Sequence, residues 1–185
     1  MNRTLACCVA AASLALNPGA QAGLTGDTIS WQYYAYGGPY LGAGSPGFFT
    51  PGVSSDAFED ASAHYFTIRG NDTQIILDEF GGVSPWSPSE VSLDEAGLFV
   101  RNGFVLGSFD APIANVWVDP TSSMVGFDSS RVTFTAAAIA VDWAEVGFAP
   151  QSQLVLNVTL VPEPAAWALM AAGLAGIGVM RRRPG

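Results

Sequence analysis

The stretch Gln153-Leu-Val-Leu-Asn-Val-Thr-Leu-Val161 decides the fold class. Leucine or valine stands at every second position from 154 to 160, and Asn157 and Thr159 stand between them. Residues two apart lie on the same face of a β-strand, so this period predicts a half-buried strand. The inner face of the strand should pack on a core, and the polar side chains should point outward.

Similar signals recur toward the N-terminus, and no segment before residue 165 has the period of a helix. Apolar or alternating runs are separated by glycine, proline, asparagine and aspartate, the residues that favour turns. The clearest runs are 27–36, 64–69, 73–80, 113–118, 132–135 and 139–143. Roughly ten short strands at this spacing are typical of an antiparallel sandwich. We therefore predict an all-β domain over residues 23–161, an antiparallel β-sandwich or a jelly-roll-like fold.

Two turn sequences stand out between these runs. Gly70-Asn71-Asp72 separates two predicted strands, and Asn102-Gly103 separates another two. Asparagine followed by glycine is typical of a two-residue hairpin, because both residues tolerate a positive φ. We expect a β-hairpin at each position.

Four tryptophans of the predicted domain can be assigned from their surroundings. Trp31, Trp117 and Trp143 fall on apolar faces of predicted strands, which favours the core over a platform for stacking sugars. Trp86 lies between Pro85 and Pro88 in a predicted loop and is the best candidate for an exposed aromatic residue.

The N-terminus has the parts of a secretory signal peptide. Arg3 is followed by an apolar run over 5–16, and then by Ala20-Gln21-Ala22. Small side chains at Ala20 and Ala22 suit the narrow pocket of a signal peptidase, so we predict cleavage after Ala22. The apolar run is too short to cross a bilayer, which requires about 20 residues.

Composition limits the chemistry of the predicted domain. The two cysteines of the chain, Cys7 and Cys8, both lie in the predicted signal peptide, so a mature chain has no disulfide or thiolate. Residues 23–161 contain fifteen carboxylates against three arginines, a net charge of −12. Such a surface repels nucleic acid, whose binding depends on neutralised phosphates. We therefore expect no nucleic-acid partner.

We find no pattern that predicts catalysis. The one histidine, His64, begins a predicted strand beside aromatic residues, which favours a structural role. Neighbouring carboxylates on a strand point to opposite faces, so the adjacent pairs carry little signal. These pairs are Glu59/Asp60, Asp78/Glu79 and Asp94/Glu95. We expect no enzyme and keep a glycan-active enzyme, which needs two carboxylates facing each other across a cleft, as a remote alternative.

Calcium is the one cofactor that the composition leaves open. Carboxylate oxygens are the ligands that Ca²⁺ prefers, and several lie in or near predicted loops. The candidates are Asp56, Glu59, Asp60, Asp119 and Asp128. No loop has the ligand spacing of a calcium-binding loop, so a solvated acidic surface is the simpler interpretation.

The last 24 residues, 162–185, form a separate unit. Pro162-Glu163-Pro164 is followed by an apolar run over 165–180 and by Arg181-Arg182-Arg183. As a helix this run is about 24 Å long, against about 30 Å for the hydrocarbon core, so it predicts a marginal transmembrane helix. The three arginines should hold its C-terminal end in the cytoplasm.

This order of motif, apolar run and terminal arginines resembles the PEP-CTERM sorting signal of Gram-negative bacteria. The resemblance implies that Pro162, Glu163 and Pro164 are recognised by exosortase, a membrane enzyme that removes the tail. Arg181, Arg182 and Arg183 would be the stop-transfer residues. Proteins with this signal are typically exported and associated with exopolysaccharide and biofilm.

The leading hypothesis is an exported structural protein of the cell surface or extracellular matrix, without catalysis and associated with exopolysaccharide. A carbohydrate-binding module acting on exopolysaccharide is the alternative. The expected processing partners are signal peptidase and exosortase. We expect a precursor tethered to the inner membrane, which reaches the cell surface or the medium if the tail is cleaved.

Overall fold

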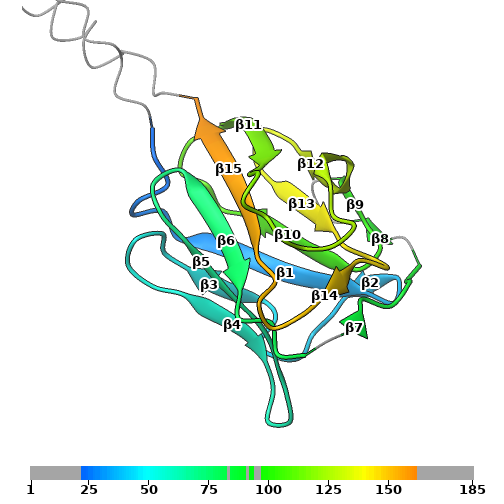
Figure 1. Ribbon diagram of the computed structural model, residues 1–185. Helices are drawn as coiled ribbons and strands as arrows, with labels where there is room; N and C mark the ends of the chain where they lie inside the picture. The colour runs from blue at the N-terminus through cyan, green and yellow to red at the C-terminus, as the bar shows by residue number, and fades with distance from the viewer. Residues whose placement is uncertain (1–21, 83, 91, 94–96, 162–185) are drawn as a thin grey trace, which may run out of the picture. The chain divides into compact units, whose positions relative to one another are not determined.

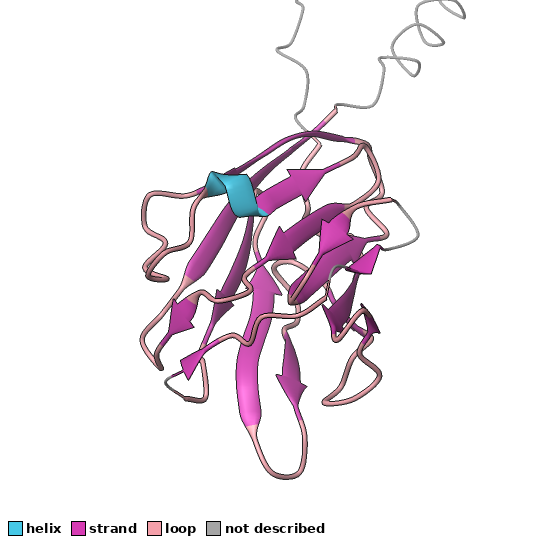
Figure 2. Cartoon of the chain, turned by 90° about the vertical axis from the view of Figure 1, so that its right-hand side faces the viewer, coloured by secondary structure: helices cyan, strands magenta, loops and turns pink. Residues whose placement is uncertain are grey.

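Two antiparallel sheets face each other across one apolar core, which confirms the predicted all-β sandwich (Figure 1). The computed structural model describes residues 22–161 except 83, 91 and 94–96. Within these residues there are fifteen strands, of which five have only two residues. The sole helical element described is a short 3-10 turn at Ser129–Arg131 (Figure 2).

The first sheet has the strand order β12-β13-β10-β1-β2, and β3 also pairs with β1. Its central strand β1 pairs with β10 so that Tyr33 lies opposite Phe104. The bounds are β1 Ile29–Ala35, β2 Gly38–Pro39, β3 Gly47–Phe49, β10 Gly103–Gly107, β12 Val132–Phe134 and β13 Ile139–Asp142.

The second sheet has the strand order β11-β15-β6-β5-β4. Its bounds are β4 Asp56–Glu59, β5 His64–Gly70, β6 Gln74–Asp78, β11 Ile113–Val118 and β15 Leu154–Leu160. Two small pairs complete the fold: β7 Ser84–Pro85 with β14 Gly147–Phe148, and β8 Ser92–Leu93 with β9 Phe99–Val100.

Strand β15 forms as its period predicts. Its four alternating apolar side chains, from Leu154 to Leu160, are all buried. On its outer face the Asn157 amide donates to Asp119 Oδ2 at 2.7 Å and accepts from Gln74 Nε2 at 3.0 Å. The strand therefore joins β6 to β11 through its backbone and through its polar face.

Large aromatic side chains fill the core between the sheets. Trp31 and Trp143, both predicted core residues, are fully buried. Phe66 of β5 lies with its ring centre 6.1 Å from that of Trp31 and 5.2 Å from that of Trp143. Burial of one large apolar side chain stabilises a fold by about 1.5–3 kcal/mol. This cluster therefore holds the two sheets together without a disulfide.

The hairpin predicted at residues 70–72 is confirmed. β5 pairs with β6, and Asn71 Oδ1 accepts the backbone N–H groups of Thr73 and Gln74, both at 3.0 Å. The side chain thus supplies acceptors that the tight turn of the backbone lacks, as asparagine commonly does in turns.

The hairpin predicted at Asn102-Gly103 is wrong. β9 pairs with β8, and β10 pairs with β1 and β13. The predicted turn needs a positive φ at both residues, and neither residue has one. Gly103 is required for another reason: a Cβ at this position would overlap the carbonyl oxygen of Val141 on the neighbouring strand.

Two of the tryptophan predictions are also wrong. Trp86 is only 8% exposed, because its ring stacks on Trp143 with the ring centres 4.8 Å apart. Trp117 is 43% exposed and lies outside the core. A register shift in β11 between Ile113 and Asn115 reverses the alternation after it, which turns Trp117 outward.

Candidate functional site

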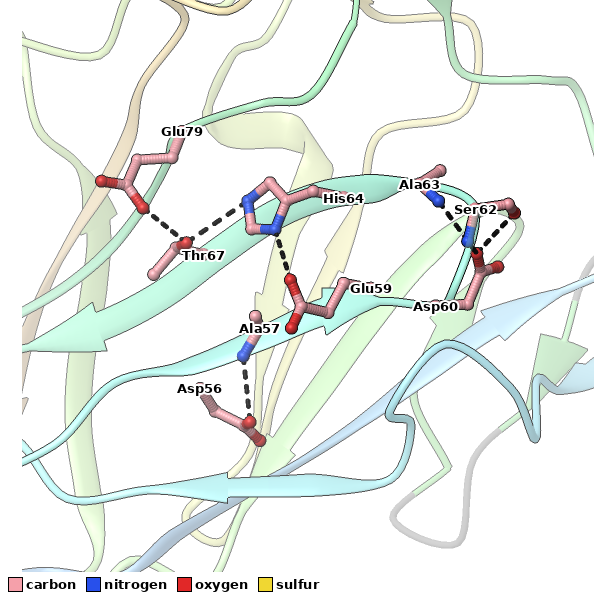
Figure 3. Close-up of polar contacts among 9 residues, drawn as sticks. All are labelled: Asp56, Ala57, Glu59, Asp60, Ser62, Ala63, His64, Thr67 and Glu79. Carbon is pink, nitrogen blue, oxygen red and sulfur yellow. Dashed lines mark hydrogen bonds and ion pairs between the residues drawn. The ribbon is translucent and has the colours of Figure 1, made fainter.

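The only histidine lies in a row of polar side chains at the β4–β5 hairpin (Figure 3). His64 Nδ1 is 2.9 Å from Glu59 Oε2, and His64 Nε2 is 3.4 Å from Thr67 Oγ1. Thr67 Oγ1 donates to Glu79 Oε2 at 2.7 Å. The imidazole ring therefore lies between a carboxylate of the preceding strand and a hydroxyl of its own strand.

This row has the order of a nucleophile, a base and an orienting acid, but its hydrogen bonds favour a structural role. The single hydroxyl proton of Thr67 goes to Glu79, over a shorter distance than that to His64. Nucleophile activation needs that proton to be directed at the base. The contacts of His64 instead connect the end of β4 with the start of β5.

Three of the predicted calcium ligands belong to local turns. Asp60, Asp119 and Asp128 each accept the hydroxyl and the backbone N–H of the serine or threonine two residues later. These hydrogen bonds lower the pKa of Asp60 and Asp128, with the serine hydroxyl as the largest cause. The pKa of Asp119 is also lowered, first by Asn157 and then by Thr121.

The two other predicted ligands are likewise engaged nearby. Asp56 Oδ2 accepts from Trp31 Nε1 at 2.8 Å and from the Phe48 N–H at 2.9 Å, and Glu59 contacts His64. Within the described part of the chain, no three histidine, cysteine or acidic side chains approach closely enough to hold a metal ion. The structure therefore does not bring the five candidates together.

The adjacent carboxylates have separate partners where they are described, but the expected alternation is wrong at Asp78/Glu79. Asp78 pairs with Arg69 and Glu79 accepts from Thr67, two residues on the same outer face of β5. Glu79 follows the end of β6 with φ 56°, so it does not continue the strand. Glu59 and Asp60 also contact different partners. The third pair, Asp94/Glu95, lies outside the described residues.

An aromatic pocket of about 150 Å³ opens at the β1–β2 end of the sandwich. Its rings come from β1, β4, β5 and the segments beside β2 and β7, and Ala35, Ser87 and Asn102 complete the lining. We define the aromatic pocket by its rings: Tyr33, Tyr36, Tyr40, Phe58, Tyr65 and Trp86. None of its described lining residues carries a charge at neutral pH.

A chain of buried hydrogen bonds supports the wall of the aromatic pocket. Trp143 Nε1 donates to the Tyr33 hydroxyl at 3.1 Å, and this hydroxyl donates to Asn102 Oδ1. Asn102 Nδ2 then donates to the Ser87 carbonyl at 2.9 Å. Burial raises the pKa of Tyr33, so its hydroxyl keeps its proton. In contrast, Trp86 Nε1 is buried and finds no acceptor among the described residues.

Tyr36 stands at the mouth of the pocket in an unusual backbone conformation. It lies in the β1–β2 turn with φ 55°, a region that a bulky residue rarely adopts. Its backbone N–H donates to Ser89 Oγ at 2.6 Å, and the residue is 73% exposed. Strained residues of this kind often accompany binding sites.

The pocket residues are those that sequence reasoning missed. Tyr33, Tyr36 and Tyr40 were visible as an aromatic-rich stretch, but period alone predicts only a strand and a turn there. The Asn102-Gly103 pattern predicts a turn, so it gives no sign that Asn102 lines a pocket. The signal that could have found the pocket is the excess of tyrosine beside Gly37-Gly38, since an exposed turn seldom needs large rings.

Most of the predicted sorting and processing residues lie outside the described part of the chain. They are Ala20, Pro162, Glu163, Pro164, Arg181, Arg182 and Arg183. Ala22 packs partly buried against the core, and Leu24 is fully buried. Cleavage after Ala22 stays a prediction. No helix in the described segments is long and apolar enough to cross a membrane, and the span predicted at 165–180 falls beyond them.

Comparison with known proteins identifies the tail of the chain. No curated protein and no solved structure matches the chain. The family model of the PEP-CTERM protein-sorting motif matches residues 160–183. This match confirms the resemblance and implies an exported protein that exosortase processes and sorts to the membrane or cell surface. The chain therefore carries a PEP-CTERM protein-sorting motif, whose match begins at the last residue of β15.

Proposed function

We propose that this protein is a structural component of the cell surface or extracellular matrix, associated with exopolysaccharide and biofilm, and without catalytic activity. The observation that carries the proposal is the direct junction between sandwich and sorting motif. Leu160 is 1% exposed at the end of β15, and the Val161 N–H donates to the Pro112 carbonyl at 2.7 Å. The folded domain thus reaches the first residues of the matched motif, so the domain itself is the sorted cargo.

The polar groups of the sandwich support a structural role. His64 bridges two strands, and the carboxylates at Asp60, Asp119 and Asp128 stabilise turns. Side chains that are engaged in this way contribute to the fold. A glycan-active enzyme remains the remote alternative, and the different partners of Asp78 and Glu79 give it no support.

A carbohydrate-binding module is the second candidate, and the aromatic pocket favours it. A flat platform of tryptophans is not supported, because Trp31 and Trp143 point into the core. The pocket offers the other common arrangement, in which rings and neutral hydrogen-bonding groups meet in a hollow.

Sorting is tested by cell fractionation and intact-mass measurement in a host that has exosortase. We expect the wild type to lose residues 165–185, and Glu163→Ala to keep them and to accumulate in the inner membrane. Glu90→Ala, an exposed glutamate of the sandwich, is the control and should be processed like the wild type. A mature wild-type protein that still contains residues 165–185 would contradict processing by exosortase.

Matrix association needs its own experiment. We expect the processed protein to cosediment with the extracellular matrix and to move to the soluble medium when polymer synthesis is disabled. An unchanged distribution in the polymer-deficient strain would contradict the association with exopolysaccharide. Because the mass measurement reports processing alone, the two parts of the proposal fail independently.

A further inference from the structure

The chemistry of the aromatic pocket selects the kind of molecule that it can hold. Its described lining joins aromatic rings with the hydroxyl groups of Tyr36, Tyr40 and Ser87 and contains no charged group. The Tyr33 hydroxyl and the Asn102 amide are already hydrogen-bonded to each other and to the wall behind them. Rings contact apolar faces, and neutral polar groups exchange hydrogen bonds with hydroxyls. A neutral molecule with one apolar face and several hydroxyls satisfies both kinds of surface, and a sugar ring has this form.

The size of the pocket limits the occupant to a single ring. Its volume is about 150 Å³. An internal cavity of about this volume holds one benzene molecule. A hexopyranose has twice as many non-hydrogen atoms as benzene, so the pocket can seat one face of a single sugar ring and leaves the rest of that ring at the open mouth. A longer glycan can therefore place one unit in the pocket, while its remaining units stay outside.

The arrangement of the pocket is rigid at its floor and open at its mouth. Tyr33 stacks on Phe58 with ring centres 4.4 Å apart, and its hydroxyl is held between Trp143 and Asn102. Tyr36, in contrast, has most of its side chain in solvent. A fixed floor lowers the entropy lost on binding, and an exposed ring at the mouth can cover an incoming sugar.

We propose that the aromatic pocket binds one neutral hexopyranose unit of a glycan, with the ring of Tyr36 stacked on the sugar. The proposal deepens the carbohydrate-binding candidate and does not depend on the sorting hypothesis. The domain's net charge of −12 disfavours uronic acids, whose carboxylates it repels. A quaternary ammonium group fits the pocket less well than a sugar, because its binding needs free ring faces around the cation. The rings of Tyr33 and Phe58 stack on each other instead.

Tyr36→Gly is the decisive variant. Glycine adopts a positive φ without strain, so the substitution should leave the turn and the thermal midpoint of the protein nearly unchanged. It removes the ring completely, and we expect the affinity for a neutral oligosaccharide to fall about tenfold. Phe48→Ala is the matched control: Phe48 is an exposed ring on β3 outside the described lining, and its loss should not change binding.

The assay uses the exported protein purified from envelope or medium and isothermal titration calorimetry. The probes are hexasaccharides of glucose, mannose and galactose, oligogalacturonate of equal length, and the free monosaccharides. We expect binding to at least one neutral hexasaccharide and weaker binding to oligogalacturonate. Tighter binding of a free monosaccharide than of its hexasaccharide would overturn the assignment to a glycan.

Three further results would overturn the proposal: no binding to any neutral probe, a preference for oligogalacturonate, or equal affinities of the wild type and Tyr36→Gly. Because the assay starts from purified protein, these outcomes are independent of how the tail is processed. A failure of sorting, in turn, appears in the intact mass and leaves the titration unaffected.

Discussion

Asp27 is a buried carboxylate whose pKa is raised in the folded protein. Its side chain belongs to a residue that is only 5% exposed, and burial is the largest cause that raises its pKa. The nearby Asp110 carboxylate raises the pKa further, although the Asp110 N–H donates to Asp27 Oδ2 at 3.2 Å and opposes the effect. The folded state therefore binds this proton more tightly than the unfolded state.

The sign of the pH dependence follows from linkage. Around and above pH 4 the unfolded chain releases this proton more readily, so the Asp27 contribution lowers stability as pH rises. We expect Asp27→Asn to be more stable than the wild type at pH 7 and equal to it near pH 3. Urea denaturation at both pH values measures the difference. A greater stability of the wild type at pH 7 would show that the charged form is favoured.

Asp119→Asn should show the opposite sign. Hydrogen bonds from Asn157 and Thr121 lower the pKa of Asp119, so its charged form stabilises the folded state above the unfolded-state pKa. This contribution is lost as pH falls through the lower folded-state pKa. We expect Asp119→Asn to be less stable than the wild type at pH 7 and to converge with it in acid. The same urea series tests both variants, and a gap that does not narrow as the pH falls from 7 into the acid range would contradict the electrostatic cause.

The buried hydrogen bond from Tyr33 to Asn102 should couple the effects of substitutions at these two residues. Asn102→Ala removes the acceptor of a buried hydroxyl, and an unsatisfied buried group costs about 1–3 kcal/mol. Tyr33→Phe removes that hydroxyl but leaves Trp143 Nε1 without its acceptor. In the double variant the Tyr33 hydroxyl is gone, so it no longer needs the acceptor that Asn102→Ala removes. The double variant should therefore be destabilised by less than the sum of the two single variants. Additive free energies of unfolding would show that the two groups are not coupled.

At the scale of elements, β15 sets a limit on processing. The matched sorting motif starts at residue 160, but Leu160 is part of the core and Val161 still bonds to Pro112. A chain ending at Val161 should keep the stability of the sandwich. A chain ending at Thr159 loses the side chain of Leu160, and loss of a buried leucine side chain costs about 2–5 kcal/mol.

Two truncated proteins, ending at Thr159 and Val161, test this limit by urea denaturation. Equal midpoints would contradict a role of Leu160 in the core. The same reasoning predicts that the mature C-terminus produced by exosortase lies at or beyond residue 161. Intact-mass measurement of the processed protein checks this position directly.

The elements also show why sequence patterns predict part of the fold and miss the rest. β5, β6 and β15 form as predicted, because alternation and the asparagine turn between β5 and β6 are local signals. Alternation predicts the wrong face for Trp117, because one register shift in β11 reverses which residues face inward. The hairpin predicted at Gly103 is wrong for a different reason. Glycine is needed there because a Cβ would overlap the backbone of β13, a strand distant in sequence.

The aromatic pocket depends on tertiary structure in the same way. Tyr36, Tyr65 and Asn102 come from separate segments, and their meeting depends on the pairing of strands within both sheets. Trp86 becomes buried because β7 pairs with β14, which brings it over Trp143. Sorting signals are the opposite case, because their order along the chain is itself the signal.

At the scale of the whole molecule, the sandwich carries far more negative than positive charge. Its three arginines are all engaged: Arg69 pairs with Asp78, Arg101 pairs with Asp142, and Arg131 donates to the Ala144 carbonyl at 2.9 Å. Among the carboxylates that the structure describes, Asp78 and Asp142 are the ones in an ion pair with an arginine. Repulsion between the remaining negative charges opposes the compact state and acts over the whole surface.

Salt should therefore stabilise this protein. The distance over which charges interact falls from about 30 Å at 0.01 M salt to about 3 Å at 1 M, so added sodium chloride screens the repulsion. We expect the thermal midpoint to rise between these concentrations at pH 7. Glu90→Lys lowers the net negative charge by two and should reduce the rise, whereas Glu90→Gln should reduce it about half as much. A midpoint that falls with salt would mean that the few ion pairs contribute more to stability than the general repulsion removes.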